Sequence, residues 1–333
     1  MKKILIIRLS SIGDIIQCMG VVGGLKEKFP DACIEWVVRS DMQGVLSIDK
    51  RIDKIHAFDK REGFKGLLRL AKQLRKERFD YIYDAHSNIR SAILKTILLP
   101  PACGYHPRHV MRSKQYFNRM LLFKFRINRF DKPFRGVISF RKPLAKWGVT
   151  AFPDAPKEWD FPSSMVEKFD NLITPRRITL VPSANWETKR WPVSHWQELV
   201  RIMPEYEFVI LGGPADTFCE DIAAVAPERT LNMAGKTSIM ESCFIVSRSN
   251  VVVSGDTGFL HAADMFGIPT LALMGPTAFG FPTGATVETL EIDLPCRPCT
   301  KDGRGACKLK EVRKCMVDIT PALVAERIKK KMK

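Results

Sequence analysis

The stretch from residue 250 to residue 275, NVVVSGDTGFLHAADMFGIPTLALMG, constrains the fold of this chain more than any other segment. It opens on a β-branched run, passes through a glycine-rich turn and closes on a second apolar run, a pattern that predicts strand, helix and strand. A βαβ unit of this kind belongs in a parallel sheet. Its turn carries Gly255, Asp256, Thr257 and Gly258 at the mouth of the helix, where unpaired N–H groups and the helix dipole favour an anion.

The same alternation extends along the whole chain. In the first half it predicts strands at residues 3–7, 33–38 and 81–83, with helices at 14–28 and 63–77. In the second half it predicts strands at 177–181, 207–211 and 251–253, with helices near 194–203, 216–225 and 239–247. We therefore predict an α/β protein with two doubly wound lobes and a ligand cleft at the carboxyl ends of the strands. Three prolines in residues 152–162 indicate a linker, so the predicted domains are residues 1–160 and 161–333.

The charge of the chain indicates an anionic partner or surface. Its 333 residues carry a formal net charge of +17. Residues 107–146 hold twelve Lys or Arg and a single acid, Asp131, and a second basic cluster closes the chain at residues 327–333. Aromatic residues interleave the first cluster, which would suit RNA, but no pattern of an RNA-binding module accompanies them. A solvated basic surface with a frayed basic tail is the alternative.

The sequence also predicts a cytoplasmic protein. The apolar run at residues 4–7 is too short for a signal peptide or a spanning helix. In that compartment the nine cysteines are expected to be thiols or metal ligands rather than disulfides. Four of them lie within twenty residues, with one C-x2-C pair that is typical of zinc sites; they predict either a structural zinc site or uncoordinated thiols: Cys296, Cys299, Cys307 and Cys315.

Polar residues follow several of the predicted strands. Asp14 comes after the first strand, near the start of a helix, so it can either complement the helix dipole or act as a general base. In the second half, Lys189 and Arg190 lie in the loop after a strand and could clamp a phosphate. Asp216 ends a Gly-Gly-Pro turn and could meet a ribose hydroxyl.

Four segments together resemble the lipopolysaccharide heptosyltransferases, glycosyltransferase family 9. They are RLSSIGD at 8–14, KRWP at 189–192, GGPAD at 212–216 and SGDTGFLH at 254–261, and their order and spacing agree over nearly the whole chain. The resemblance implies a GT-B fold, with an ADP-heptose donor held by the C-terminal lobe and a lipopolysaccharide inner-core acceptor, lipid A-Kdo or heptosyl, on the N-terminal lobe. It also implies an inverting transfer that needs no metal or other cofactor, at the inner face of the inner membrane.

The resemblance assigns roles to individual residues. Asp14 matches the proposed catalytic base of the family, and Lys189 matches its diphosphate-binding lysine. The other residues predicted to bind the donor are Ser183, Asp216, Asp256, Thr257, Gly258 and His261. The residues predicted to bind the acceptor are Ser11, Asp84, Asn88, Arg108, Arg112 and Lys114. Asp84 also follows a strand and is the alternative candidate for the base.

Two other functions stay open at this point. A GT-B nucleotide-sugar epimerase would share the lobes and the donor turn but would use no lipid-linked acceptor. A non-catalytic basic binding protein, for instance for nucleic acid, would show a steep salt dependence of binding. The transferase prediction includes no nucleic-acid partner.

Overall fold

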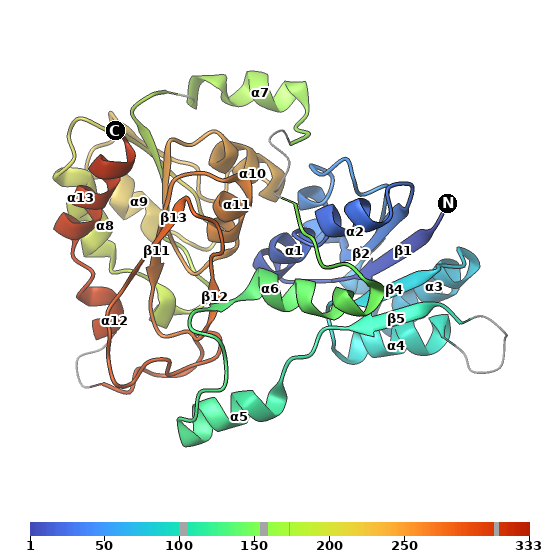
Figure 1. Ribbon diagram of the computed structural model, residues 1–333. Coiled ribbons are helices and arrows are strands. Elements are labelled where there is room, and N and C mark those ends of the chain that lie inside the picture. The colour runs from blue at the N-terminus through green and yellow to red at the C-terminus, as the bar shows by residue number, and fades with distance from the viewer. Residues whose placement is uncertain (100–105, 154–158, 173, 310–312) are drawn as a thin grey trace. The chain divides into compact units, whose positions relative to one another are not determined.

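The computed structural model describes residues 1–99, 106–153, 159–172, 174–309 and 313–333, and the chain forms two compact units (Figure 1). The first unit comprises residues 1–115 and 137–160, and the second comprises 116–136 and 161–333. The chain therefore crosses between units more than once, whereas the sequence suggested a single boundary after residue 160. The excursion at 116–136 groups with the second unit because Phe123, Phe130 and Phe134 pack their rings around Phe279, at centroid distances of 6.0, 5.1 and 4.9 Å.

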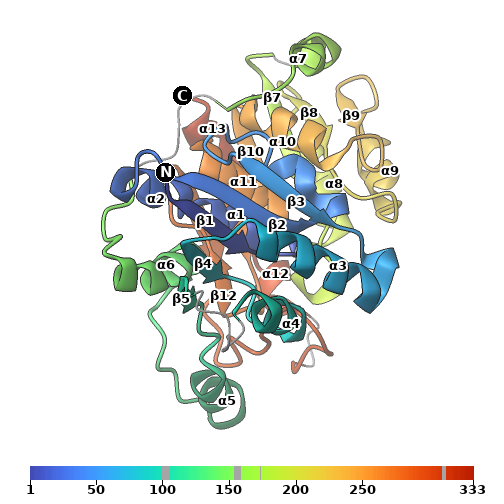
Figure 2. The ribbon, with the colours of Figure 1, turned by 90° about the vertical axis from the view of Figure 1, so that its right-hand side faces the viewer.

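The first unit is built on a parallel sheet in the order β3-β2-β1-β4-β5 (Figure 2). Its strands are β1 Lys3–Ile7, β2 Cys33–Arg39, β3 Lys54–Phe58, β4 Tyr81–Asp84 and β5 Arg108–Met111. Residues 4–7 of β1 are completely buried, as expected of a central strand covered on both faces. The chain order reverses between β1 and β4, so the loops that follow these two strands diverge at the carboxyl edge, where open α/β sheets bind ligands.

The helices of the first unit differ from the prediction at one point. They are α1 Ile12–Met19, α2 Val22–Lys28, α3 Gly63–Lys76, α4 Ile89–Leu98 and α6 Gly136–Arg141, with short 3-10 turns at Ser40–Val45, Lys60–Glu62 and Lys142–Trp147. The single helix expected at 14–28 is interrupted between α1 and α2. At the break, the N–H groups of Gly20 and Val21 donate to the carbonyls three residues back, at 3.3 and 3.0 Å, rather than four. The Gly20 carbonyl accepts a hydrogen bond from Arg141 Nε at 3.1 Å.

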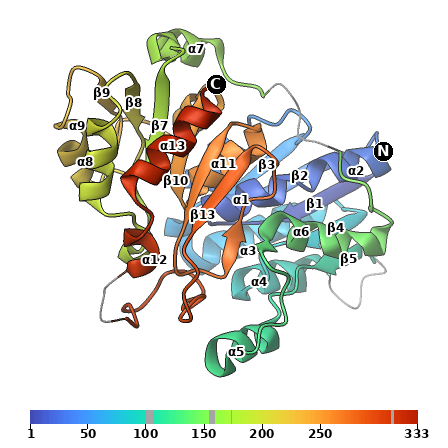
Figure 3. The same ribbon diagram turned by 60° about the vertical axis from the view of Figure 1, so that its left-hand side comes forward.

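The second unit contains a six-stranded parallel sheet in the order β13-β11-β10-β7-β8-β9 (Figure 3). Its strands are β7 Arg177–Val181, β8 Glu207–Ile210, β9 Thr230–Asn232, β10 Val251–Gly255, β11 Thr270–Met274 and β13 Val287–Glu291. A separate pair joins β6 Phe134–Arg135 to β12 Phe279–Phe281. Its helices are α5 Tyr116–Phe125, α7 Ser163–Phe169, α8 Val193–Arg201, α9 Phe218–Ala223, α10 Ile239–Ser247, α11 Gly258–Phe266, α12 Lys314–Val317 and α13 Pro321–Lys331, with 3-10 turns at Asp170–Leu172 and Glu187–Lys189. The chain order reverses between β7 and β10, which marks the ligand edge of this sheet.

The basic C-terminus is part of the fold rather than a frayed tail. Val324 and Ile328 of α13 are completely buried, and the helix packs against α8 (Figure 3). Its lysines form ion pairs, for instance Lys329 with Glu205 at 3.0 Å. Among the described helices, none combines the length and hydropathy that crossing a bilayer requires.

Candidate active site

Asp14 lies at the carboxyl edge of the first sheet, held between two arginines. Its carboxylate contacts Arg8 Nη2 at 2.5 Å and Arg112 Nη1 at 3.8 Å, and Ser11 Oγ donates to it at 2.9 Å. Both guanidinium groups are buried beside the Phe140 ring, at 5.4 and 3.7 Å from its centre. The Asp14 side chain keeps 36% of its surface exposed, so the structure brings Ser11, Asp14 and Arg112 together at a solvent-accessible point.

Asp84, the alternative base, has a different environment. Its side chain is only 1% exposed and forms an ion pair with Lys95 at 2.9 Å. Its oxygens also accept hydrogen bonds from the N–H groups of His86 and Ser87 and from the Ser91 hydroxyl, at 2.8 to 3.0 Å. A carboxylate that is enclosed in this way organises the loop after β4, and no side of it is open to an acceptor hydroxyl.

Asn88 orients His86, a residue that the sequence analysis missed. The Asn88 side-chain oxygen accepts from the Ser91 N–H at 3.1 Å as the cap of α4, so its amide group faces His86 Nε2 at 2.7 Å. Nε2 is therefore the acceptor of this pair, and the proton of a neutral His86 ring belongs on Nδ1. Among the described residues, no hydrogen-bond partner lies beside Nδ1, which is buried.

This edge of the first sheet carries positive charge. Burial, together with the charges of Arg8 and Lys114, lowers the pKa of His86 to about 4, so the ring is neutral at pH 7. Burial also lowers the pKa of Arg112, but a guanidinium stays charged. Arg8 adds a second buried guanidinium. It lies in the motif at residues 8–14, but the sequence alone assigned it no role. The arrangement favours an anionic ligand.

Arg108 does not belong to this group. It begins β5 opposite Tyr81, at the amino edge of the sheet, whereas Arg112 follows the end of the same strand. Arg108 instead lines an open pocket of about 440 Å³ with Lys2, Arg78 and His106. Arg108 and Arg112 thus lie at opposite edges of the sheet. That both bind the acceptor stays a prediction.

In the second unit, Lys189 and Asp256 meet at the point where the strand order reverses. Lys189 follows β7, Asp256 follows β10, and their side chains form an ion pair at 2.8 Å. Both are largely buried, with 14% and 12% of the side-chain surface exposed. Thr277 Oγ1 donates to the Asp256 carboxylate at 2.9 Å and holds it in place. A lysine is thereby fixed at the edge of the sheet where a ligand is expected.

The N-terminus of α11 adjoins the Lys189–Asp256 ion pair. Thr257 caps the helix, its hydroxyl accepting from the Leu260 N–H at 3.4 Å, and Gly258 is the first helical residue. The buried His261 brings Nε2 to 3.9 Å from the Asp256 carboxylate. Gly280 has φ +103, and a Cβ there would lie 2.7 Å from Asp256 Oδ1. Gly280 is thus a further site residue that was not predicted, since its role depends on a contact across the fold.

The remaining predicted donor residues lie in neighbouring loops. Asp216 accepts from the Gly213 N–H at 2.8 Å and pairs with Arg190 at 3.4 Å, so it closes its own turn. Ser183 lies in the loop after β7 and is partly exposed. The structure therefore brings Lys189, Asp256, Thr257, Gly258 and His261 together, with Asp216 and Ser183 on adjacent loops.

The four clustered cysteines lie near one another in the second unit. Burial raises the pKa of Cys315 to about 11, and the pKa of Cys299 is raised by burial and by the charges of Cys296 and Cys307. The Cys307 sulfur accepts from the Arg313 N–H at 3.3 Å. Within the described part of the chain, no group of three or more His, Cys, Asp or Glu is arranged to hold a metal ion. The structural zinc site therefore stays a prediction.

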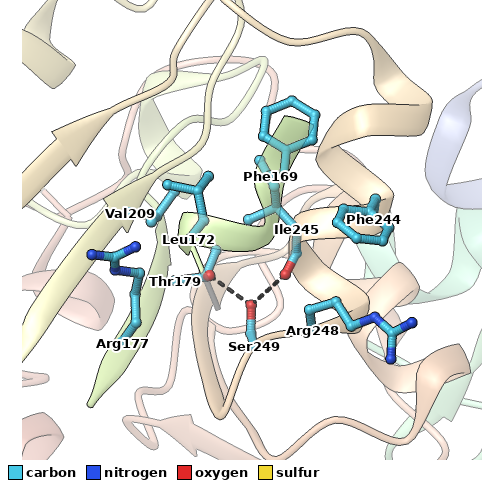
Figure 4. Close-up of a pocket in the computed structure, with 9 residues that line it drawn as sticks. All are labelled: Phe169, Leu172, Arg177, Thr179, Val209, Phe244, Ile245, Arg248 and Ser249. Atoms are coloured by element: carbon cyan, nitrogen blue, oxygen red, sulfur yellow. Dashed lines mark hydrogen bonds between the residues drawn. The ribbon is translucent and has the colours of Figure 1, made fainter. Parts of the chain in front are cut away.

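A small cavity elsewhere in the second unit is not a substrate site (Figure 4). Phe169, Val209 and Ile245 line it, and Ser249 hydrogen-bonds both Thr179 and the Ile245 carbonyl. Its volume of about 10 Å³ leaves room for a water molecule but not for a sugar nucleotide.

Solved structures with this fold define its class. A glycosyl transferase family 9 structure from Veillonella parvula matches with a TM-score of 0.78 and 20% identity, over 99% of this chain and 97% of that one. The structure of E. coli ADP-heptose lps heptosyltransferase II matches with a TM-score of 0.72 and 19% identity, over 100% of this chain and 98% of that one. The two Rossmann-like units have the GT-B fold of these structures.

Sequence comparison gives the family. The profile of glycosyltransferase family 9 (heptosyltransferase) matches residues 67–312, and the chain belongs to this family. A relative, the lipopolysaccharide core heptosyltransferase OpsX of Haemophilus influenzae, is 26% identical over 281 residues, which cover 82% of this chain and 78% of that protein. The chain is therefore a glycosyltransferase, and the comparisons favour neither the epimerase nor the binding-protein alternative.

Proposed function

We propose that this protein transfers a heptose from ADP-heptose to the inner core of lipopolysaccharide, with inversion at the anomeric carbon. The observation that carries the proposal is the Lys189–Asp256 pair beside the mouth of α11, at the ligand edge of the second sheet. A cation and a helix N-terminus at one point suit a diphosphate. The similarity to OpsX supports the assignment of the acceptor.

The donor diphosphate would bind through Lys189 and the first turn of α11. The N–H groups of a first turn have no acceptor within the helix, so they can donate to phosphate oxygens. In the absence of an anion, Asp256 neutralises Lys189 and holds its ammonium group at the site. When the anomeric C–O bond breaks, ADP leaves with the bonding electrons, and these donors stabilise its charge.

Asp14 would act as the general base. The acceptor hydroxyl attacks the anomeric carbon from the face opposite ADP, forms the new C–O bond and gives its proton to the Asp14 carboxylate. The exposure of Asp14, set against the enclosure of Asp84, supports this choice. Arg8 and Arg112 would hold Asp14 in place and attract the anionic acceptor.

A transfer assay tests the proposal. The protein is incubated with ADP-heptose and a heptose-deficient core acceptor, with and without excess chelator, and the product is analysed by mass spectrometry and NMR. We expect one added heptose, inverted relative to the donor, in both conditions. ADP-heptose turnover that does not depend on the acceptor would instead support the epimerase reading. Loss of activity in chelator that magnesium restores would contradict metal-independent transfer.

We further propose that the reaction takes place at the cytoplasmic face of the inner membrane, because the acceptor is anchored in a lipid layer. The net charge of +17 supports a contact with an anionic surface. Fractionation of cells at low and high salt tests this point: the protein should leave the membrane fraction as the salt concentration rises. A distribution that salt does not change would contradict an electrostatic contact.

A further inference from the structure

The helix α5 exposes large apolar side chains on its outer side. Tyr116, Phe117 and Met120 are 71%, 60% and 45% exposed. Their spacing sets them within about 100° of one another around the helix axis. Phe125 and Ile127, at the end of the helix and just beyond it, are 53% and 49% exposed. Exposed apolar groups gathered on one element of a soluble protein indicate an interaction surface.

This exposure does not reflect a poorly packed helix. Toward the end of α5, Leu122 is buried, and the Phe123 ring packs edge-on against Phe279 at 6.0 Å. The Arg119 guanidinium lies 4.3 Å from the centre of the same Phe279 ring. After the helix, Arg126 Nη1 donates to the Pro298 carbonyl at 2.7 Å. The segment is thus fixed by contacts of residues 119–126, while the rings of Tyr116 and Phe117 face solvent.

Positive charge surrounds the exposed rings. Residues 116–136 contain six Lys or Arg and one acid, Asp131. Four of these cations have exposed side chains: Lys124, Arg126, Arg129 and Lys132. In all three ribbon views α5 lies away from the six-stranded sheet of its own unit (Figures 1, 2 and 3). Aromatic and aliphatic groups flanked by cations are the composition of a helix that lies in a membrane interface.

We propose that the outer side of α5 docks on an anionic phospholipid bilayer, with Tyr116, Phe117 and Met120 at the boundary between headgroups and acyl chains. The proposal names the surface by which the proposed transferase would reach its lipid-linked acceptor. Phe279, against which α5 packs, lies close to the donor turn of the same unit. It directly precedes Gly280, whose backbone approaches Asp256. Membrane docking would therefore hold the donor site near the lipid surface.

Sedimentation with vesicles tests the docking. The full chain is mixed with vesicles of phosphatidylcholine alone or with phosphatidylglycerol, at low and high salt. We expect binding to the anionic vesicles, weakened by salt. The double variant Tyr116→Ser/Phe117→Ser should lower the partition coefficient at least about tenfold, since each ring adds apolar area to the buried surface. The matched control Phe64→Ser removes a ring that is 59% exposed on α3, in the first unit, and should bind as the wild type does.

Equal vesicle binding by the wild type and the double variant would overturn the proposal. The proposal would also be overturned if the wild type were a dimer, the double variant were a monomer and neither bound vesicles. The rings would then join two copies of the chain. Transfer to a delipidated core oligosaccharide separates this proposal from the proposed function. The double variant should retain that activity, whereas failure of the wild type to transfer heptose would contradict the proposed function and leave the vesicle result intact.

Discussion

Acidification should destabilise the first unit through His86. Burial depresses the pKa of this imidazole from 6.5 to about 4 in the folded chain. Between these values the unfolded chain binds a proton that the folded chain does not, so stability is complete above about pH 6.5 and is lost as the pH falls toward 4. Lowering the pH from 7.5 to 5 should cost about 2 kcal/mol through this one group.

Urea unfolding of the wild type and of His86→Gln at several pH values measures this cost. Glutamine keeps an acceptor for the Asn88 amide but does not titrate, so the pH dependence of its unfolding free energy should be flatter by about 2 kcal/mol between pH 7.5 and 5. The buried Trp36 and Trp147 report the unfolding of this unit by fluorescence. His109→Gln, on an exposed position of β5, is the control. Parallel curves for the wild type and His86→Gln would show that His86 does not contribute to the pH dependence of stability.

Three substitutions and one metal analysis give further tests. Asp14→Asn should lower turnover ~10²–10⁴-fold and leave the donor dissociation constant nearly unchanged; close to full turnover would exclude Asp14 as the base. Lys189→Met should weaken donor binding about 10–100-fold by calorimetry, because it removes a charged donor, and unchanged affinity would move the diphosphate elsewhere. Gly280→Ala should abolish donor binding by collision with the site, whereas Gly267→Ala, also at positive φ but in open space, should only lower stability; equal binding losses would contradict this distinction. Metal analysis of anaerobically purified protein decides between the two predictions for Cys296, Cys299, Cys307 and Cys315: stoichiometric zinc would support a structural site, and protein free of zinc and iron would rule it out.

The strand-turn-helix pattern was sufficient to predict the centre of each sheet. β1, β7 and β10 lie where the alternation of apolar runs predicted them, because a strand buried on both faces must be continuously apolar. The loops after these strands carry Asp14, Lys189 and Asp256, so the ligand edges could be located from sequence. The pairing of Lys189 with Asp256 follows from the adjacency of β7 and β10, which no local pattern encodes.

The basic region shows why other parts could not be predicted. Arg108 and Arg112 are four residues apart in sequence, but in a strand that separation is about 13 Å and sets them at opposite edges of the sheet. Recognising this requires knowing that residues 108–111 pair with β4. In the same way, Phe123 and Phe117 are both aromatic residues of one helix, and only the distant Phe279 determines that Phe123 packs against another ring while Phe117 stays exposed.

We propose that this protein adds heptose to the lipopolysaccharide core with Asp14 as its base. Mass spectrometry of the core oligosaccharide from a strain that lacks the protein, complemented in turn by the wild type and by Asp14→Asn, tests both parts of this proposal. We expect a core truncated at a heptose, restored by the wild type and not restored by an equal amount of the Asp14→Asn protein. An intact core in the deletion strain, or full restoration by Asp14→Asn, would contradict the claim.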